Sequence, residues 1–561
     1  MVCKTALAGQ IDGKGEMVMK KAFSLLLAFV MVFSLSTGAL AANYIEAVPI
    51  KYDSADIFSD GLAVVSRDGK YGYVDHSGRE AIPCRYSCAW RFSEGLAVIN
   101  QGGTIKDGNV IGGEYGFVDK NGKEVVTCHY QNAWAFSDGA ALVMQNNQYG
   151  FLSPTGKVIS LCKYNDARQF TDGYARVYIT GKGWGFIDKS GKEVVPCKYQ
   201  SAADFSEGLA AVKKDGKWGF VNESGKEVIP CKYHQVYNFN DGLAAVQFSG
   251  AWGFVDKTGK EVVALQYHET YCFSEGIAPV RMHGLWGFIN KSGKEVAPCV
   301  YGYAWAFEGG VARVNRGCSF DSSNHVVGGA YGLVNKSGAE IVPCEYEVIG
   351  ILSDGLFLAQ REGKYGFINK QGKEVIACSY DGAWDFSDGF AVVEQNGKYG
   401  YIDKNGTEVV PCVFDYAEDS SEGLGLVQLN GKFGHVALDA SSVTAAVNVT
   451  VGGKAVKWSG AVPFIDGNGR TMVPLRAVAD ALGLTVRWNG AKREASFSDG
   501  SKTIYFPIDS QNAYTSDGKT IQMNTAAIII DGNTYAPILY LAEFFGYTVS
   551  WNGATRTVSL E

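Results

Sequence analysis

Short apolar runs separated by glycine-containing polar turns recur along most of this chain. Within one unit, residues 205–208 (FSEG) predict a turn and residues 209–212 (LAAV) predict a short buried strand. Asp215-Gly216 predicts a hairpin, because glycine supplies the positive φ that a tight turn needs. A second strand is expected at residues 218–221 and a third at residues 227–233. Each unit is therefore predicted to be a three-stranded antiparallel meander followed by a loop of about ten residues.

An aromatic residue followed by glycine marks the second strand of every unit. Most neighbouring markers are 34 residues apart, as Trp218 and Trp252 are. A fixed period of this size indicates an array of supersecondary units, each burying its apolar face against a neighbour. The eleven markers are Tyr71-Gly72, Tyr115-Gly116, Tyr149-Gly150, Trp184-Gly185, Trp218-Gly219, Trp252-Gly253, Trp286-Gly287, Tyr331-Gly332, Tyr365-Gly366, Tyr399-Gly400 and Phe433-Gly434.

Alternation along the predicted strands assigns side chains to the faces of the sheet. In the third strand, Cys231 and Pro230 lie on opposite faces. Pro230 lacks the N–H that a central strand would donate, so this strand is expected to be bulged or to lie at an edge. Gly219 lies between Trp218 and Phe220, which predicts a close approach of another backbone segment.

The aromatic–glycine markers, the FS(D/E)G turn and the KSGKEVVPCKY-type hairpin resemble the WG-repeat family of bacterial proteins over about residues 47–437. The resemblance implies a repeat architecture and no common enzymatic activity. The expected fold is mainly β: an eleven-unit antiparallel array followed by a small α+β domain. We expect the array to be a solenoid or superhelix, because eleven units exceed the roughly four to eight blades of a typical propeller. One or two closed propellers are the alternative.

Two units carry inserts in the same turn. They are GGTIKDGNVIGG at residues 102–113 and GCSFDSSNHVVGG at residues 317–329, and they lie six units apart. If one superhelical turn holds six units, the two inserts are expected to stack on one face of the array.

The cysteines follow the repeat. Nine of the thirteen occupy one equivalent position, and the sixth unit has Leu265 there. A position that accepts leucine is apolar, and free cysteine behaves there as a small hydrophobe. A ladder of buried thiols is therefore favoured, with disulfides between neighbouring units or metal ligation as alternatives. Cys88, Cys272 and Cys318 lie off the ladder and are expected to be exposed. The ladder residues are Cys84, Cys128, Cys162, Cys197, Cys231, Cys299, Cys344, Cys378 and Cys412.

One repeat position, two residues before the phenylalanine of the FS(D/E)G turn, is a candidate contact site. It accepts Asp56 and Arg168, so it is expected to face solvent. Its aromatic members are rings of the kind that stack on sugars or anchor protein partners. The alternative is that each ring only covers a neighbouring loop. The candidate residues are Trp90, Trp134, Tyr237, Tyr271, Trp305 and Trp384.

The repeat period ends near residue 437, and residues 438–444 are expected to form a linker. Residues 445–561 contain a second duplication with an offset of 63 residues, which relates Trp488 to Trp551. Each half is predicted to form a hairpin, a helix that begins near a proline and ends at a glycine, and a second hairpin.

The two halves, GRTMVPLRAVADALGLTVRW and NTYAPILYLAEFFGYTVSW, are similar to the copper amine oxidase N-terminal-like domain, a small α+β stalk module of exported bacterial proteins. The resemblance implies a non-catalytic attachment or interaction domain. The second half has Leu539 where the first has Arg476, and no histidine cluster is present for copper.

The N-terminal residues 1–41 are expected to be an upstream extension and a secretory signal peptide, cleaved near Ala41. Lys20 and Lys21 precede an apolar run at residues 22–35. No later apolar run is long enough to span a membrane. The net charge of −7, without a basic stripe, argues against nucleic acid as a partner. We therefore expect a secreted or cell-surface protein, with the array at residues 42–437.

The chain contains neither a Gly-x-Ser-x-Gly nor a His-Glu-x-x-His motif, and no cofactor or metal is expected. The interpretation is an exported, non-catalytic binding or scaffold protein. Its array is the interaction surface, its C-terminal module attaches it to the envelope or contacts a protein, and its partner is an envelope protein or cell-wall polysaccharide. One alternative is a hydrolase of envelope polysaccharide with acids from the inserts, Asp107 and Asp321. The other is a purely structural spacer.

Overall fold

The computed structural model describes residues 44–323, 325–439, 447–458, 463–465, 470–530, 533–552 and 557–561. The expected signal peptide, and most of the expected linker, lie outside the described residues. Within the part of the chain that is described, no helix is both long and apolar enough to cross a membrane.

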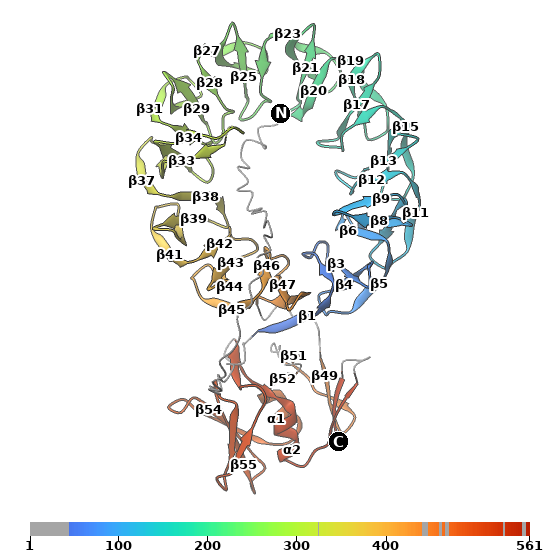
Figure 1. The fold of residues 1–561 in the computed structure, drawn as a ribbon, viewed down its shortest axis with the longest axis vertical. Coiled ribbons are helices and arrows are strands. Elements are labelled where there is room, and N and C mark those ends of the chain that lie inside the picture. Colours follow the sequence, from blue (N-terminus) through green and yellow to red (C-terminus); the bar gives the residue numbers. More distant parts are fainter. Residues whose placement is uncertain are drawn as a thin grey trace, which may run out of the picture.

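Eleven four-stranded antiparallel sheets, which we call blades, are arranged in a ring (Figure 1). Three strands of each blade are the predicted meander. The remaining strand comes from the predicted loop, whose residues form a strand on the side of the central opening. The prediction of three strands per unit was therefore wrong, because the loop residues pair with the first strand of the meander instead of leaving the sheet.

Each blade runs from an inner strand at the central opening to an outer strand at the rim. Blade 1 contains β2 (Ser54–Ala55), β3 (Leu62–Arg67), β4 (Lys70–Asp75) and β5 (Glu80–Tyr86); blade 2 contains β6 (Cys88–Ser93), β7 (Leu96–Gln101), β10 (Glu114–Asp119) and β11 (Glu124–Tyr130); blade 3 contains β12 (Asn132–Ala133), β13 (Ala141–Gln145), β14 (Gln148–Leu152) and β15 (Val158–Tyr164); blade 4 contains β16 (Asp166–Ala167), β17 (Tyr174–Ile179), β18 (Gly183–Asp188) and β19 (Glu193–Tyr199). Blade 5 contains β20 (Ser201–Ser206), β21 (Leu209–Lys214), β22 (Lys217–Asn222) and β23 (Glu227–Tyr233); blade 6 contains β24 (Gln235–Val236), β25 (Leu243–Phe248), β26 (Ala251–Asp256) and β27 (Glu261–Tyr267); blade 7 contains β28 (Glu269–Thr270), β29 (Ile277–Met282), β30 (Leu285–Asn290) and β31 (Glu295–Tyr301); blade 8 contains β32 (Tyr303–Ala304), β33 (Val311–Arg316), β36 (Ala330–Asn335) and β37 (Glu340–Tyr346). Blade 9 contains β38 (Val348–Ser353), β39 (Leu356–Arg361), β40 (Lys364–Asn369) and β41 (Glu374–Tyr380); blade 10 contains β42 (Gly382–Ala383), β43 (Phe390–Gln395), β44 (Lys398–Asp403) and β45 (Glu408–Phe414); blade 11 contains β46 (Tyr416–Ala417), β47 (Leu424–Leu429), β48 (Lys432–Ala437) and β1 (Ile45–Tyr52). The inserts form two further hairpins, β8 (Thr104–Lys106) with β9 (Asn109–Ile111), and β34 (Ser319–Phe320) with β35 (Val326–Val327).

Strand β1 closes the ring. It pairs antiparallel with β48, with Ile45 opposite Ala437 and Tyr52 opposite Phe433. The outer strand of the last blade therefore comes from the beginning of the array. The predicted mainly β repeat array with a small α+β domain is confirmed. Its geometry is a closed ring of propeller type, the alternative to the preferred solenoid, because the first and last units complete one sheet.

The FS(D/E)G turn connects most blades to the next blade through side-chain hydrogen bonds. Ser59 Oγ of blade 1 donates to the carbonyl oxygen of Phe92 in blade 2 at 2.7 Å. Asp60, which has a positive φ of 56°, accepts the N–H of Gly95 in blade 2 at 2.8 Å. The side chains of one turn thus satisfy backbone groups in the adjacent turn, which are obligatory hydrogen-bonding groups. We call this pair of contacts the blade hook.

The blade hook also joins blade 11 to blade 1. Ser421 Oγ donates to the carbonyl oxygen of Phe58 at 2.6 Å, and the N–H of Gly61 donates to the Glu422 carboxylate at 3.1 Å. His76 of blade 1 lies 2.7 Å from the same carboxylate. The seam between the two ends of the array therefore uses the same interactions as the other blade contacts.

The aromatic–glycine markers lie beneath a bulge of the outer strand. A Cβ atom on Gly219 would lie 2.4 Å from the carbonyl oxygen of Ile229 and 2.6 Å from the amide nitrogen of Cys231. The register between β22 and β23 shifts at this point, and Pro230 is exposed there. The predicted close approach at the glycine and the bulge at the proline are both confirmed.

The ladder thiols lie on these bulges. They are free, and each is half-buried or buried, as Cys197 is. Cys231 Sγ lies 3.6 Å from the carbonyl oxygen of Val212 across the marker glycine. Burial raises the pKa of Cys128 to about 12 and that of Cys197 to about 11, so these thiols stay protonated. They are apolar packing groups, as predicted.

The prediction that Cys88, Cys272 and Cys318 are exposed was wrong. Cys88 and Cys272 are buried, with exposed fractions of 8% and 5%, and Cys318 is half-buried. Cys88 lies in the inner strand β6, which packs between two blades. The prediction from the repeat pattern placed Cys88 in the loop between two units and therefore overestimated the exposed fraction of its side chain.

The C-terminal module surrounds two short helices with three sheets. Its elements are β49 (Asn448–Val451), β50 (Lys454–Ala455), β51 (Phe464–Ile465), β52 (Thr471–Pro474), α1 (Leu475–Ala481), β53 (Thr485–Asn489), β54 (Glu494–Ser498), β55 (Thr503–Pro507), β56 (Asn512–Thr515), β57 (Thr520–Gln522), β58 (Ile528–Ile530), β59 (Asn533–Pro537), α2 (Ile538–Phe544), β60 (Val549–Asn552) and β61 (Thr557–Leu560). The two halves meet where β52 pairs antiparallel with β59. Met472 and Tyr535 of these strands belong to the same buried cluster as Ala47 and Val48 of β1. The module therefore packs at the seam of the ring.

Removal of β1 is expected to open the ring. Deleting residues 44–52 takes away the apolar side chains of Ala47, Val48 and Tyr52 and leaves blade 11 with three strands. We expect a loss of about 5 kcal/mol in the free energy of unfolding and a larger radius of gyration in small-angle X-ray scattering. Replacing residues 102–113 with an Asp-Gly turn is the matched control, since most blades lack this insert, and should change neither quantity. A ring that stays closed without β1 would contradict the assignment of the seam.

Acid is expected to destabilise the seam through His435. This side chain is fully buried, its Nε2 donates to the carbonyl oxygen of Asp56 at 2.8 Å, and burial lowers its pKa to about 4. An unfolded histidine titrates near 6.5, so between pH 6.5 and 4 only the unfolded chain takes up the proton. The free energy of unfolding should therefore fall by about 3 kcal/mol as the pH decreases across this range.

Urea unfolding at several pH values measures this loss, with His435→Phe as the control. Phe220 occupies the equivalent position in blade 5, so phenylalanine suits the fold and removes only this titration. Parallel pH profiles for the two proteins would disprove the role of His435, since all other titrating groups are shared.

Candidate functional site

The six candidate aromatic residues lie along the inner wall of the ring. Trp90 lies within the inner strand β6, and each of the others directly follows the inner strand of its blade, as Trp134 follows β12. The wall is uneven, since blade 5 has Ala203 and blade 9 has Gly350 at the same position. The exposed fractions of Trp90 and Trp384 are 36% and 42%, and the other four rings are half-buried. Their contact with a ligand stays a prediction.

Each candidate ring packs on the marker aromatic of its own blade. The ring centroids are 5.6 Å apart for Trp90 and Tyr115, and 5.1 Å apart for Tyr271 and Trp286, whose planes differ by 2°. Each ring therefore covers part of its own blade while retaining some exposed surface. The remaining pairs are Trp134–Tyr149, Tyr237–Trp252, Trp305–Tyr331 and Trp384–Tyr399.

The structure brings three of the candidates together in blades 6 to 8. The ring of Tyr271 lies 6.3 Å from that of Tyr237 and 6.2 Å from that of Tyr303. The hydroxyls of Tyr271 and Tyr303 are 2.6 Å apart. Tyr303 also contacts Trp305 at 4.6 Å and the exposed Phe320 of the insert at 5.9 Å. We call these five residues the aromatic band. Trp90, Trp134 and Trp384 lie in other blades, outside the band.

A half-buried pair of charged groups lies at the end of the aromatic band. The Arg313 guanidinium lies 4.8 Å from the ring centroid of Trp305 and donates to the carbonyl oxygen of Ile349 at 3.1 Å. Burial lowers the pKa of Arg313 and raises that of Asp385 to about 6, an effect that the charge of Arg313 opposes. A Cβ atom on Gly350 would lie 3.0 Å from Asp385 Oδ1. Blade 9 has Gly350 in place of an aromatic residue at the candidate position, and this leaves room for the Asp385 carboxylate.

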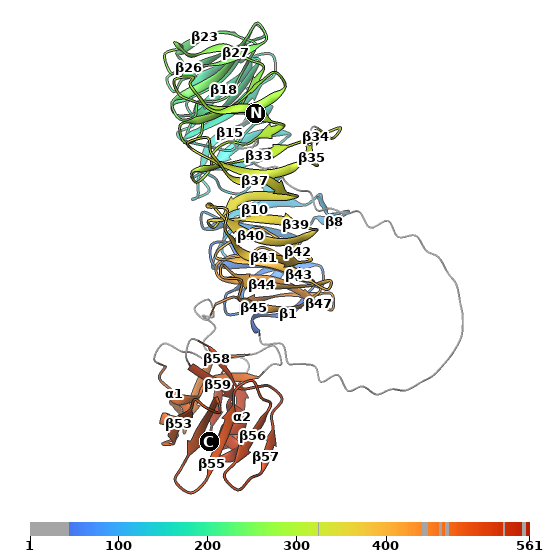
Figure 2. The same cartoon turned by 90° about the vertical axis from the view of Figure 1, so that its left-hand side faces the viewer.

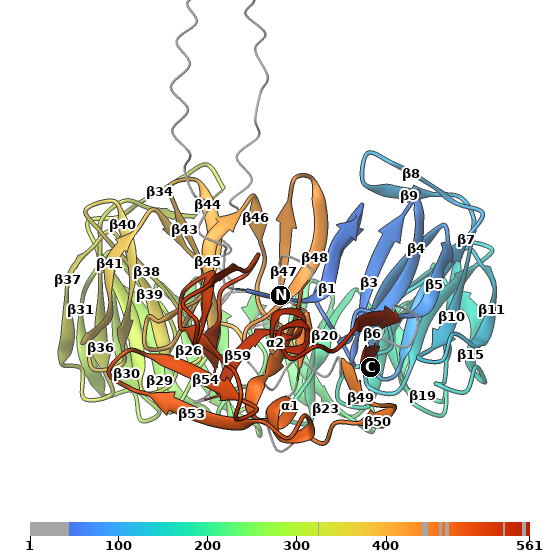
Figure 3. The same cartoon turned by 90° about the horizontal axis from the view of Figure 1, so that it is seen from below.

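Both insert hairpins project from the same face of the ring (Figures 2 and 3). This confirms the expected common face. The hairpins do not stack, however, because one turn of the ring holds eleven blades and not six, and they lie on opposite sides of the opening (Figure 1). Ile111 of one hairpin and Phe320 of the other have exposed fractions of 53% and 41%.

The proposed acids of a hydrolase do not come together. Asp107 and Asp321 belong to different hairpins on opposite sides of the ring (Figure 1). The Asp321 carboxylate accepts the backbone N–H groups of His325 and Ser323, which lowers its pKa. Asp321 is thus a turn-stabilising residue, and the two carboxylates cannot act on one bond.

Comparing equivalent positions of the repeat units did not identify three residues of this site: Tyr303, Phe320 and Arg313. Tyr303 lies in the inner strand at a position that is polar in the two preceding blades, where Gln235 and Glu269 stand. Comparing that second variable position across the units would have identified it. Phe320 lies in an insert without counterparts in most units, so the repeat offers no signal for it.

Within the described residues, no group of three or more His, Cys, Asp or Glu side chains is placed to hold a metal ion. The described part of the C-terminal module therefore does not fit a copper site, despite its resemblance to a domain of copper amine oxidases.

Comparisons with known proteins match two families to different parts of the chain. The family model "Copper amine oxidase N-terminal domain" matches residues 450–560. A protein described as a protease inhibitor from Brevibacillus choshinensis is 27% identical over 112 residues, which are 20% of this chain and 33% of that protein. This chain thus spans about a third of that relative's length.

Solved structures with a likeness have low TM-scores. A eukaryotic initiation factor aligns at a TM-score of 0.33 and 11% identity, covering 54% of this chain and 89% of that one. The extracellular domain of a putative hybrid two-component system from B. thetaiotaomicron aligns at 0.19 and 11% identity, covering 85% and 77%. At these scores neither alignment supports a functional argument.

The family model "WG containing repeat" matches eleven segments between residues 46 and 433, which together make up more than half of the chain. Each full match begins at an aromatic–glycine marker, and most end within two residues of the next one, whereas the matches 71–104 and 286–317 end at the two inserts. The first segment, residues 46–71, is shorter and contains β1, which completes blade 11. The chain therefore belongs to the family of WG-repeat proteins.

Proposed function

We propose that this chain is an exported, non-catalytic binding protein whose ring holds a partner at its inner wall. The observation that carries the proposal is the unevenness of that wall. The core positions of the repeat are filled in the same way in nearly every blade, whereas the inner position changes from Ala203 and Gly350 to tryptophan and tyrosine. Packing alone does not require these rings, because blades 5 and 9 fold without them.

The chemistry of the aromatic band suits a partner with flat apolar faces and hydroxyl groups. Partly exposed tyrosine and tryptophan rings supply contact area at low conformational entropy cost. The insert of blade 8 adds Phe320 at the edge of the band. An envelope protein or a cell-wall polysaccharide fits this surface, and the signal-peptide pattern of residues 1–41 would deliver the chain to either one.

The C-terminal module is proposed to attach the ring to the envelope or to another protein. Its packing against β1 would transmit that attachment to the seam. Neither matched family is a catalytic domain. The separation of Asp107 from Asp321 further favours binding over hydrolysis.

A retention assay tests the role of the aromatic band. The mature chain and the triple variant Tyr237→Ala, Tyr271→Ala, Trp305→Ala are passed over immobilised cell wall and, separately, over immobilised envelope proteins. Blade 5 accepts Ala203 at this position, so the variant should fold, which circular dichroism checks. Loss of aromatic anchors should reduce retention about tenfold or more.

Leu161→Ala is the matched control, since Leu161 lies on an outer strand with an exposed fraction of 71%. It should leave retention unchanged. Equal retention of the triple variant and the wild type would show that the inner wall is not the binding surface. Absence of any retention would favour the spacer alternative.

A further inference from the structure

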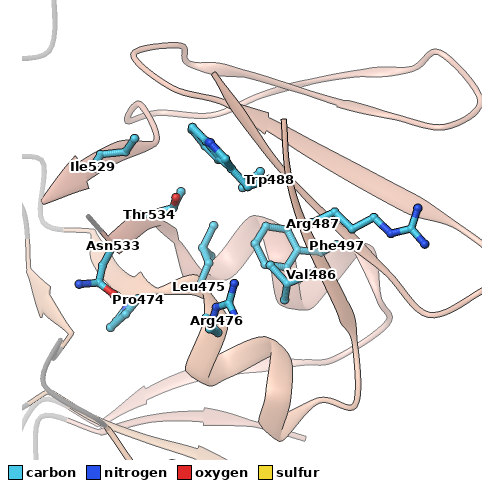
Figure 4. A pocket seen from close by; sticks show the side chains of 11 residues that line it. Pro474, Leu475, Arg476, Val486, Arg487, Trp488, Phe497, Ile529, Asn533 and Thr534 are labelled. Carbon is cyan, nitrogen blue, oxygen red and sulfur yellow. The ribbon is translucent and has the colours of Figure 1, made fainter. Parts of the chain in front are cut away.

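The C-terminal module contains a pocket between its first helix and two sheets (Figure 4). Its volume is about 300 Å³, at the lower end of the range of ligand pockets. Leu475, at the start of α1, and Phe497, in β54, are both 1% exposed and form its apolar floor. Trp488 and Ile529 stand at its opening with exposed fractions of 48% and 41%. The pocket has room for about one large apolar side chain.

The charged residues that line this pocket are both cationic, and its other polar residues are the neutral Asn533 and Thr534. Arg476, the second residue of α1, and Arg487 of β53 both line it, and none of its lining residues is acidic. Arg476 rises beside Leu475 and Val486, whereas Arg487 extends away from the other side chains (Figure 4). Among the described residues, neither guanidinium has an ion pair, and neither donates a side-chain hydrogen bond. In a chain of net charge −7, this is a local site for a carboxylate.

Two sheet edges flank the pocket. β53 is the last strand of the sheet β53-β54-β55-β56-β57, and β58 is the last strand of the sheet β51-β52-β59-β58. Val486 and Trp488 come from the first edge, and Ile529 comes from the second. An edge strand offers unpaired N–H and C=O groups to an extended peptide, while a neighbouring pocket selects a side chain.

Comparing the two halves of the module shows which pocket residues are common to both halves and which occur in the first half alone. Trp551 corresponds to Trp488 and is equally exposed, at 46%. Leu539 stands where the first half has Arg476. The exposed tryptophan is therefore common to both halves, and the cation in the first turn of the helix belongs to the first half alone. A guanidinium specific to one copy is not needed to fold this unit.

We propose that this pocket binds an extended segment of a partner protein in which an acidic residue and a large apolar residue lie two positions apart, so that both side chains point to the same face. The apolar side chain lies on Leu475 and Phe497 beside Trp488, and the carboxylate pairs with Arg476. The peptide backbone adds to the edge strand β53. This inference rests on the proposed role of the C-terminal module as a contact domain, and it names the chemistry that the module recognises.

Fluorescence polarisation with the mature full-length chain tests the proposal. The probe is a fluorescein-labelled hexapeptide in which glutamate and phenylalanine lie two positions apart and serine fills the other positions, so that both side chains share one face. It should bind in the micromolar range, and the same peptide with lysine in place of glutamate should bind at least about tenfold more weakly, because Arg476 repels it. Arg476→Leu introduces the residue of the second half and should weaken binding of the acidic probe about tenfold or more. Trp488→Ala should weaken it similarly.

Trp551→Ala is the matched control, since it removes an equally exposed ring from the other half. It should leave the affinity within about twofold of the wild type. Thermal melting verifies that each variant is folded, and the exposed position of Arg476 makes its replacement tolerable. Equal affinity of Arg476→Leu and the wild type, equal binding of the two peptides, or no binding of the acidic probe at millimolar concentration would overturn the proposal.

The retention assay distinguishes a failure of the proposed peptide pocket from a failure of the proposed binding role of the ring. If the triple variant of the aromatic band loses retention but the acidic probe does not bind the wild type, the peptide pocket is excluded and the binding role of the ring stands. If the probe binds through Arg476 but the triple variant of the aromatic band is retained normally, the role of the inner wall fails and the pocket stands.

Discussion

The blade hook is the interaction on which the ring depends. In most blades a serine hydroxyl and a carboxylate from one turn satisfy a carbonyl and an N–H of the next turn, so the contact between blades is directional as well as apolar. The contact of Ser421 with Phe58 and of Glu422 with Gly61 repeats it across the seam. A series of similar directed contacts in most blades restricts the angle between neighbouring blades, and the number of blades follows from that angle. Eleven units fill one turn, so the inner strands surround a wide opening and their side chains become available as a wall.

The repeat could be predicted from the sequence because the residues that define it lie within a single unit. The close approach at Gly219 and the bulge at Pro230 depend on residues within one unit, and the buried position of Cys231 follows from its neighbours. Ring closure depends on residues at the two ends of the array. Residues 46–52 (EAVPIKY) match the third strand of other units, as in residues 80–86 (EAIPCRY), and no such strand follows Phe433-Gly434. This orphan strand is the signal that would have favoured a closed ring over a solenoid.

The candidate site was only partly predictable for the same reason. A position that varies between units, such as that of Trp90 and Ala203, identifies the inner wall without a structure. Which of its rings meet depends on the angle between blades, and so the aromatic band of blades 6 to 8 emerges only in three dimensions. Phe320 joins the band through an insert that has no counterpart in most units. Arg313 was missed although Arg176 occupies the same position before Ala203, and each of these arginines donates to a backbone carbonyl of the following blade, which lacks a ring. In the C-terminal module, the internal duplication likewise identifies the unusual Arg476 but not the pocket beneath it.

The position of β1 also has a kinetic consequence for the molecule. Ile45 pairs with Ala437, so the whole intervening chain must be synthesised and folded before β1 reaches its partner. Contacts with such a large separation along the chain carry a high loop-closure entropy and form late. Until then the apolar side chains of β1 and the open edge of β48 can pair with the same segments of a neighbouring copy. Exchange of β1 between molecules, which would join rings into swapped oligomers, is therefore the misassembly route that this topology leaves open.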